Sequence, residues 1–130
     1  MVADASALVD FVLQTERFDN VGGVIQASDA DLHVPALCDV EAVAALRRAL
    51  LVGALSESRA NEALQDYQGL PLTHHDHQAL LERMLELRNN FSTYDAVYVS
   101  LAERLGAALL TSDERLAQAA RTHLSLPVLP

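Results

Sequence analysis

Short apolar stretches bounded by turn residues alternate along this chain with longer segments in which apolar side chains recur at helical spacing. This alternation is typical of an α/β domain built around a parallel sheet, and it constrains the fold more than any other feature. The predicted strands lie at residues 1–3, 32–35, 69–74, 107–110 and 126–129. Because 130 residues suit one hydrophobic core, we predict a single domain over residues 1–130.

The segments between these strands carry helical periodicity. We predict a helix capped by Ser6, a second over 18–27, a third from residue 37 to Gly53, and others over 56–67, from Asp76, from Ser92 to Gly106, and over 113–121. The apolar stripe of the third consists of Leu37, Val40, Val43, Leu46 and Leu50, and that of the Ser92 helix of Tyr94, Val97, Tyr98, Leu101 and Leu105. Pro71, Pro127 and Pro130 predict that the third and last strands lie at sheet edges, where a missing N–H is tolerated.

The charge of the chain excludes several mechanisms. Eighteen acidic and nine basic residues give a net charge of −9, the wrong sign for a protein that binds nucleic acid by neutralising phosphates. All nine basic residues are arginine, so a Walker phosphate loop and a Schiff-base lysine are both excluded. The lone Cys38 cannot form an internal disulfide and is expected to be a small buried side chain. No apolar run is long enough to span a membrane, and Asp4 rather than a basic residue is the first charge after Met1, so we expect a soluble, cytoplasmic protein.

Four acidic residues occupy the positions where ligands bind in a parallel α/β sheet, beyond the carboxyl ends of the strands. Asp4 and Asp113 follow predicted strands, and Glu41 and Asp95 lie early in predicted helices. Each taken singly is also explained as a helix-capping or dipole-opposing group, worth about 0.3–1 kcal/mol. Capping does not explain why the acids recur after successive elements that converge at one end of the sheet.

Carboxylates drawn together in a cleft repel one another unless a cation compensates them. Oxygen ligands without His or Cys suit hard ions, so Mg²⁺ or Mn²⁺ is preferred over zinc. Two such ions would change the formal charge from −9 to −5, since −9 + 4 = −5, with the gain concentrated where a phosphate must approach.

Four blocks of the sequence resemble those of a known protein family. They are Asp4-Ala-Ser-Ala-Leu, Glu41-Ala-Val-Ala-Ala-Leu-Arg-Arg, Tyr94-Asp-Ala-Val-Tyr-Val-Ser-Leu-Ala and Leu110-Thr-Ser-Asp. In order and spacing they resemble the PIN-domain nucleases over nearly the whole chain, most closely the VapC-type ribonuclease toxins of bacterial toxin–antitoxin pairs. The resemblance implies a three-layer α/β/α sandwich with a central, mainly parallel sheet, a Mg²⁺- or Mn²⁺-dependent endoribonuclease activity on RNA, and a cognate antitoxin. We also expect a homodimer.

The resemblance further implies which residues form the site. The family's four acids fall on Asp4, Glu41, Asp95 and Asp113, and its polar helpers on Ser6 and Thr111. We expect Asp4 and Asp95 to ligate metal directly, while direct and water-mediated roles remain open for the other two acids. Asp39 precedes the family's glutamate and is a candidate outer-shell group. The implied reaction is metal-assisted phosphodiester hydrolysis that leaves a 5′-phosphate and a 3′-hydroxyl.

Other motifs admit two interpretations each. The run His74-His75-Asp76-His77 is either a transition-metal site or, as we favour, a solvated turn in which Asp76 caps a helix. Arg47-Arg48 either contacts RNA phosphate or lies on a solvated helix face. Phe91, Tyr94 and Tyr98 are candidates for stacking RNA bases. For Tyr94 and Tyr98, which have helical spacing, we favour core or dimer contacts instead.

Two other function classes compete with the ribonuclease. A catalytically silent PIN-like interaction module would keep the fold and the partner without productive metal geometry, and the presence of all four acids argues against it. A receiver-type phosphorylation switch also places acids around Mg²⁺, but that class needs a lysine beside its acidic pocket and this chain has none.

Overall fold

A five-stranded parallel sheet lies at the centre of the computed structural model, which describes residues 1–13, 25 and 31–129. The strands are β1 (Val2–Ala3), β2 (Leu32–Pro35), β3 (Leu72–His75), β4 (Leu109–Leu110) and β5 (Val128–Leu129). Their order is β3-β2-β1-β4-β5, and every neighbouring pair is parallel. The predicted parallel sheet is confirmed, with the two proline-marked strands at its edges and the two-residue β1 at its centre.

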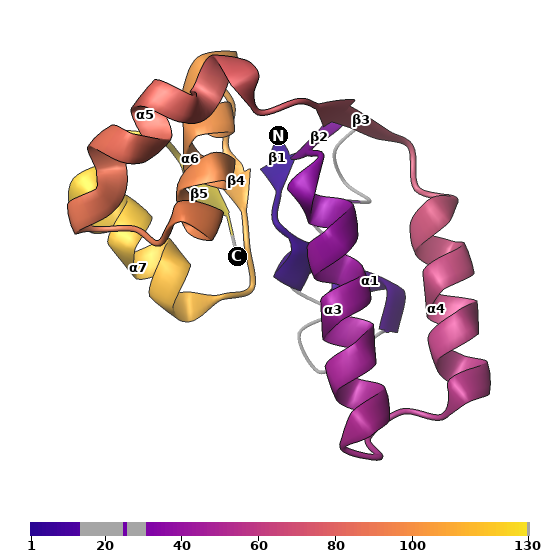
Figure 1. Ribbon diagram of the computed structural model, residues 1–130. Helices are drawn as coiled ribbons and strands as arrows, with labels where there is room; N and C mark the ends of the chain where they lie inside the picture. Colours follow the sequence, from indigo (N-terminus) through magenta and orange to yellow (C-terminus); the bar gives the residue numbers. More distant parts are fainter. Residues whose placement is uncertain (14–24, 26–30, 130) are drawn as a thin grey trace.

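Helices cover both faces of this sheet and make three layers. The chain moves outward from β1 to β3 through α1 (Ala5–Leu13), α3 (Leu37–Leu51) and α4 (Glu57–Gln68), crosses back through α5 (Leu81–Glu86) and α6 (Thr93–Leu105), and reaches β5 through α7 (Glu114–His123). Because crossovers between parallel strands are right-handed, this reversal of direction sends the two helix groups to opposite faces. Figure 1 shows α1, α3 and α4 on one side of the strands and α5, α6 and α7 on the other. The predicted α/β/α sandwich is confirmed.

Helix ends follow the predicted signals. Ser56 and Ser92 accept the N–H groups of Arg59 and Asp95 and so cap α4 and α6. Gly106 ends α6 in the left-handed conformation, with φ of 60°. The helix predicted over 18–27 falls, except for Ile25, outside the described residues.

The buried face of α3 differs from the predicted one. Val40 and Val43 are 67% and 51% exposed, whereas Leu46 is buried as predicted. Cys38 is buried as expected, and Ala42 is the buried residue of this face that was not predicted. Small side chains on this face let α3 pack closely against α1, which apolar periodicity alone does not reveal. The larger valines are left on the outer surface.

The segment after Asp76 is a second departure, because it is not one continuous helix. It consists of a 3₁₀ turn (Gln78–Leu80), α5, and another 3₁₀ turn (Leu87–Asn89). Asp76 Oδ1 accepts the N–H of Gln78 and so opens the first turn as a cap. We find no feature of the sequence that accounts for the break.

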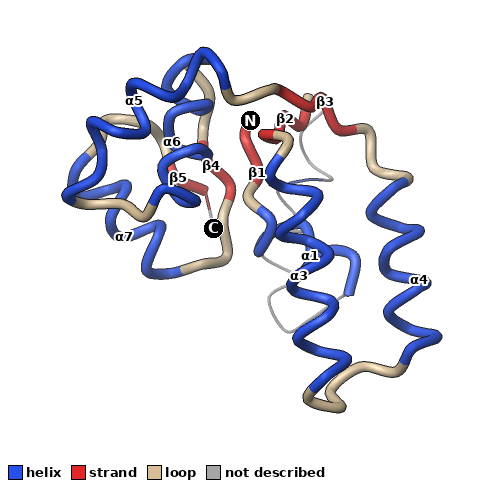
Figure 2. Tube along the Cα trace, in the orientation of Figure 1, coloured by secondary structure: helices blue, strands red, loops and turns tan. Residues whose placement is uncertain are grey.

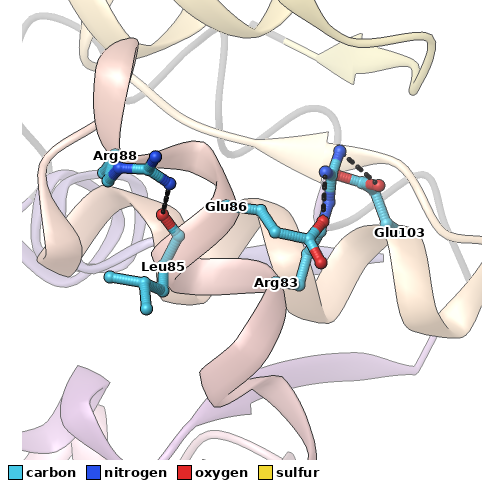
Figure 3. Close-up of polar contacts among 5 residues, drawn as sticks. All are labelled: Arg83, Leu85, Glu86, Arg88 and Glu103. Atoms are coloured by element: carbon cyan, nitrogen blue, oxygen red, sulfur yellow. Dashed lines mark hydrogen bonds and ion pairs between the residues drawn. The ribbon is translucent and has the colours of Figure 1, made fainter.

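A surface ion pair between Arg83 and Glu103 joins α5 to α6 (Figure 3). Arg83 contacts Glu86 at 3.1 Å and Glu103 at 3.2 Å, and Arg88 donates to the carbonyl of Leu85. Exposed pairs of this kind contribute at most about 1 kcal/mol each. The packing of α6 therefore depends chiefly on its apolar contacts.

The core is formed by the strands and the helix faces that cover them. Its largest fully buried side chains include those of Leu8, Val34, Val97, Leu101, Leu109 and Leu110. Figure 2 shows how short the strands are beside the helices, so most of this core is helix packed on a narrow sheet. Within the described residues, no helix has the length and apolar character that crossing a membrane requires.

Candidate functional site

A pocket of about 240 Å³ opens where β1 and β4 end. The chain turns from β1 toward β2 on one side and reaches β4 on the other, so this is the point where the strand order reverses and ligands usually bind in such sheets. Its lining includes all four predicted acids, Asp4, Glu41, Asp95 and Asp113. The structure therefore brings together residues that are up to 109 positions apart in the sequence.

Asp4 is buried, at 5% exposed, at the floor of this pocket. Its Oδ1 accepts the hydroxyl of Ser6 at 2.7 Å and the N–H of Ala7 at 3.0 Å, and its Oδ2 accepts the hydroxyl of Thr111 at 2.5 Å. The predicted cap of this helix was Ser6, but Asp4 is the residue that caps α1. Ser6 and Thr111 instead donate to Asp4, as expected of polar helpers.

Asp113 both caps a helix and lines the pocket. It caps α7 by accepting the N–H groups of Arg115 and Leu116 at 2.9 and 3.2 Å, and it also lines the pocket. Its own N–H donates to Thr111 Oγ1 at 3.0 Å, so Thr111 joins Asp4 to Asp113. Capping and membership of the pocket are therefore compatible.

Glu41 and Asp95 reach the pocket from opposite faces of the sheet. Glu41 is on α3, and its Oε1 accepts the hydroxyl of Tyr98 at 2.5 Å. Asp95 is in the first turn of α6, beside the capping Ser92. Both carboxylates are half-buried.

Burial and mutual repulsion raise the pKa of three of these acids. Burial, and to a smaller extent the negative charge of Asp113, raises the pKa of Asp4 to about 6. The hydrogen bonds from Thr111, Ala7 and Ser6 act in the opposite direction and lower this pKa. The pKa of Glu41 is raised mainly by burial and also by the charge of Asp95. The pKa of Asp95 is raised mainly by burial and also by the charge of Asp113. The four carboxylates thus form one electrostatically coupled group.

Positive charge around the pocket is sparse. Among the described lining residues Arg48 is the one base, so four acids and one arginine give a local charge of −3 when all are ionised. Arg47 is exposed and is not among the lining residues. Of the two arginines considered as phosphate contacts, only Arg48 is placed to make one here.

The donor set suits a hard divalent cation. It offers carboxylate and hydroxyl oxygens in a partly buried, strongly negative pocket, and the raised pKa values mark a charge excess that a cation would relieve. In the part of the chain that the structure describes, no three His, Cys, Asp or Glu side chains form a group that could hold a metal ion. Since Mg²⁺ commonly takes one or two carboxylates and keeps several waters, the residues fit an ion held partly through water rather than a closed chelate.

Asp39, expected as an outer-shell group, belongs to a different pocket. It accepts the hydroxyl of Tyr67 at 2.7 Å and pairs with His74 at 2.9 Å on the far side of α3. This expectation was wrong because residues two positions apart on a helix point in different directions. Asp39 and Glu41 therefore face away from each other.

The histidine run does not gather at one point. His74 pairs with Asp39, His75 lies 2.8 Å from His33 across β2 and β3, and His77 accepts the N–H of Leu37. His74 and His75 belong to strand β3, so the run is not the solvated turn that we favoured, and its separate partners do not form a single metal site.

The aromatic residues divide in the same way. Tyr98 is 2% exposed and belongs to the core, as favoured from its spacing, whereas Tyr94 is 63% exposed and does not belong to the stripe. Phe91 is 7% exposed and is also part of the core. Tyr94 lies in the first turn of α6, whose neighbouring residues Ser92 and Thr93 are also exposed.

Two polar residues of this region were not predicted from sequence. Ser112 is 8% exposed, and its N–H and hydroxyl both lie 3.3 Å from Ser6 Oγ. Tyr98 was assigned only to packing or stacking, yet it hydrogen-bonds to Glu41. Its position one helical turn after Asp95 is the signal that would have found it, because residues i and i+3 share a helix face.

Comparisons with known proteins show the family of this chain. The family model described as the PIN domain matches residues 1–122, so the chain belongs to the PIN-domain family. Ribonuclease VapC3 of Mycobacterium tuberculosis is 38% identical over 120 residues, which cover 92% of this chain and 86% of that protein. Ribonuclease VapC9 of the same organism is 38% identical over 131 residues, covering 100% of this chain and 98% of that protein. The predicted resemblance to PIN-domain proteins of the VapC type is confirmed.

A solved structure shows the same fold at much lower sequence identity. The crystal structure of VapC20 from Mycobacterium tuberculosis, a toxin that cleaves the sarcin–ricin loop, superposes with a TM-score of 0.72. The match covers 99% of this chain and 98% of that one at 13% identity, so it supports the architecture alone.

Proposed function

We propose that this chain is a metal-dependent endoribonuclease, the toxin of a toxin–antitoxin pair, which hydrolyses RNA phosphodiesters in the pocket lined by Asp4, Glu41, Asp95 and Asp113. The observation that carries the proposal is the convergence of these four carboxylates on one pocket at the reversal of strand order. Membership of the PIN-domain family and relatives named VapC ribonucleases support the same reaction class.

Some residues of the pocket are proposed to bind the metal ion, and others orient the residues that bind it. Asp4 and Asp95 are the proposed direct ligands of Mg²⁺ or Mn²⁺, and Glu41 and Asp113 complete the negative field around it. A bound divalent ion supplies a Lewis acid that lowers the pKa of water and offsets the charge of the scissile phosphate. Ser6 and Thr111 hold the two oxygens of Asp4 in place.

Substrate approach depends on the same charges. Arg48 at the pocket rim is placed to contact an RNA phosphate, while the carboxylates alone would repel it. In-line attack of water on the phosphodiester leaves a 5′-phosphate and a 3′-hydroxyl.

The partners belong to the proposal as well. We expect an antitoxin whose basic side chain reaches into the acidic pocket and replaces the cation as the compensating charge. Exposed apolar side chains such as Val40, Leu51, Val52 and Leu85 supply surface for this antitoxin and for a homodimer. Because the proposed substrate is RNA, we expect the activity in the cytoplasm.

Purified protein incubated with total RNA tests this function. We expect cleavage with Mg²⁺ or Mn²⁺ that stops in EDTA, products with 5′-phosphate ends, and growth arrest when the chain is expressed without a partner. Asp95→Asn should abolish both effects, whereas Glu57→Gln, a first-turn acid of α4 outside the pocket, should leave them unchanged. Undiminished cleavage in EDTA would contradict the metal mechanism, and no cleavage under any condition would favour a catalytically silent interaction module.

A further inference from the structure

Tyr98 lies in the wall of the acidic pocket, between its two helices. It is on α6, three residues after Asp95, is 2% exposed, and lines the pocket. Its hydroxyl donates to Glu41 Oε1 at 2.5 Å, so one hydrogen bond links α6 to α3 beyond the strand ends. Burial raises the pKa of Tyr98 well above its usual range, which keeps the phenol a neutral donor.

Glu41 needs such a contact to stay in place. Its side chain has three rotatable bonds, and the charge of Asp95 acts against it. Within the described residues, Oε2 accepts no hydrogen bond from the protein. The Tyr98 bond therefore fixes one oxygen of the carboxylate and leaves the other free for a ligand.

We propose that Tyr98 is a positioning residue that holds the Glu41 carboxylate in the orientation in which it serves a divalent cation in the pocket. This inference rests on the proposed function and adds a residue to it. Tyr98 does not touch the substrate or the metal and acts only through Glu41.

Tyr67 on α4 provides a matched control. Tyr67 donates its hydroxyl to Asp39 at 2.7 Å, is 6% exposed, and contacts the opposite side of α3. Both tyrosines also lie close enough to the buried Cys38 to influence the pKa of its thiol. The two tyrosines thus make nearly the same contacts, but only Tyr98 bonds to an acid that lines the pocket.

The test compares Tyr98→Phe with Tyr67→Phe, each of which removes one hydroxyl and keeps the ring. Calorimetric titration of Mn²⁺ into the RNA-free protein should show about tenfold weaker binding for Tyr98→Phe and parental binding for Tyr67→Phe, since loss of a residue that orients a ligand typically costs about 10–100-fold in metal affinity. The two variants should lose similar amounts of thermal stability. The rate of cleavage of total RNA should fall for Tyr98→Phe at low Mn²⁺ and recover toward the parental rate as Mn²⁺ rises.

Two further variants show whether the effect passes through Glu41. In a Glu41→Gln background, adding Tyr98→Phe should not weaken Mn²⁺ binding further, because coupled residues are not additive. Glu41→Asp keeps the charge but withdraws the carboxylate from the phenol, and it should weaken binding as Tyr98→Phe does. This variant tests the same bond if Tyr98→Phe does not fold.

Each other outcome overturns a stated claim. If Tyr98→Phe binds Mn²⁺ like Tyr67→Phe while the parent cleaves RNA with metal, the positioning role is wrong and the proposed function stands. Equal losses from Tyr98→Phe in the parent and in Glu41→Gln would show that Tyr98 does not act through Glu41. A parent protein that neither binds Mn²⁺ nor cleaves RNA would overturn the proposed function and this inference with it.

Discussion

At the scale of single residues, Asp4 is the side chain most constrained by its surroundings. Three donors hold its two oxygens, while burial raises its pKa to about 6. The hydrogen bonds orient the carboxylate, and the burial makes its charge costly until a cation arrives. A residue in this condition is suited to binding a metal ion, and less suited to supporting the metal-free fold.

Asp4 gives the metal-free protein a defined dependence on pH. Its pKa is raised from 3.8 to about 6, so its contribution to the free energy of unfolding is fully present below about pH 4 and is lost as pH rises through about 6. The shift corresponds to roughly 3 kcal/mol. Because metal ligation needs the ionised carboxylate, a fixed concentration of Mg²⁺ should raise the melting temperature more at about pH 7.5 than at about pH 5.

Differential scanning calorimetry with and without Mg²⁺ at the two pH values measures this effect. Asp4→Asn, which cannot ionise, should lose both the Mg²⁺ stabilisation and its dependence on pH. A Mg²⁺ shift of the same size at both pH values would show that Asp4 is not involved.

The four acids could be predicted at residue scale because each lies at a strand end or an early helix position, which sequence periodicity reveals. Their hydrogen bonds could not, since Ser6, Thr111 and Ser112 meet only when residues more than 100 positions apart fold together. Tyr98 packs its ring in the core and also donates its hydroxyl to Glu41, and the hydrophobic pattern predicted only the packing.

At the scale of elements, glycines mark the ends of helices in two different ways. Gly106 follows α6 with φ of 60°, whereas Gly69 follows α4 with φ of −82°. A Cβ at Gly106 meets nothing within 4 Å, and one at Gly69 meets only ordinary contacts at 3.5 Å and beyond. Backbone conformation, rather than space, therefore distinguishes the two positions.

Gly106→Ala should lower the free energy of unfolding by about 1 kcal/mol, because alanine is strained in the left-handed region. Gly69→Ala, its matched control, should be neutral or stabilise by about 0.5 kcal/mol through the unfolded chain. Urea denaturation of both variants measures the difference. Equal stability of the two would mean that the left-handed end of α6 is not formed in solution.

Sequence patterns predicted the order and type of most elements, because Gly, Pro and Ser punctuate them. The buried face of α3 was predicted wrongly at Val40 and Val43, because a hydrophobic pattern favours these larger residues over the small Ala42. The break around α5 was also missed. In both cases the structure depends on what the helix packs against, and a local pattern does not contain that information.

At the scale of the whole molecule, net charge and fold act together. A chain of charge −9 gathers four acids and one arginine around a single pocket at the end of a parallel sheet. The two helix layers supply this pocket from opposite sides, with Glu41 from α3 and Asp95 from α6. The central claim is that these four carboxylates act as one divalent-cation site.

Titration of Mn²⁺ into the RNA-free protein tests that claim most directly, with Asp4→Asn, Glu41→Gln, Asp95→Asn and Asp113→Asn compared with the control Glu57→Gln. We predict that each of the four substitutions weakens binding, that the control binds as the parent does, and that Asp95→Asn in EDTA melts at or above the parental temperature because it relieves repulsion. Parental Mn²⁺ affinity in all four variants, or a less stable Asp95→Asn that retains binding, would return these acids to the role of helix caps and contradict the account.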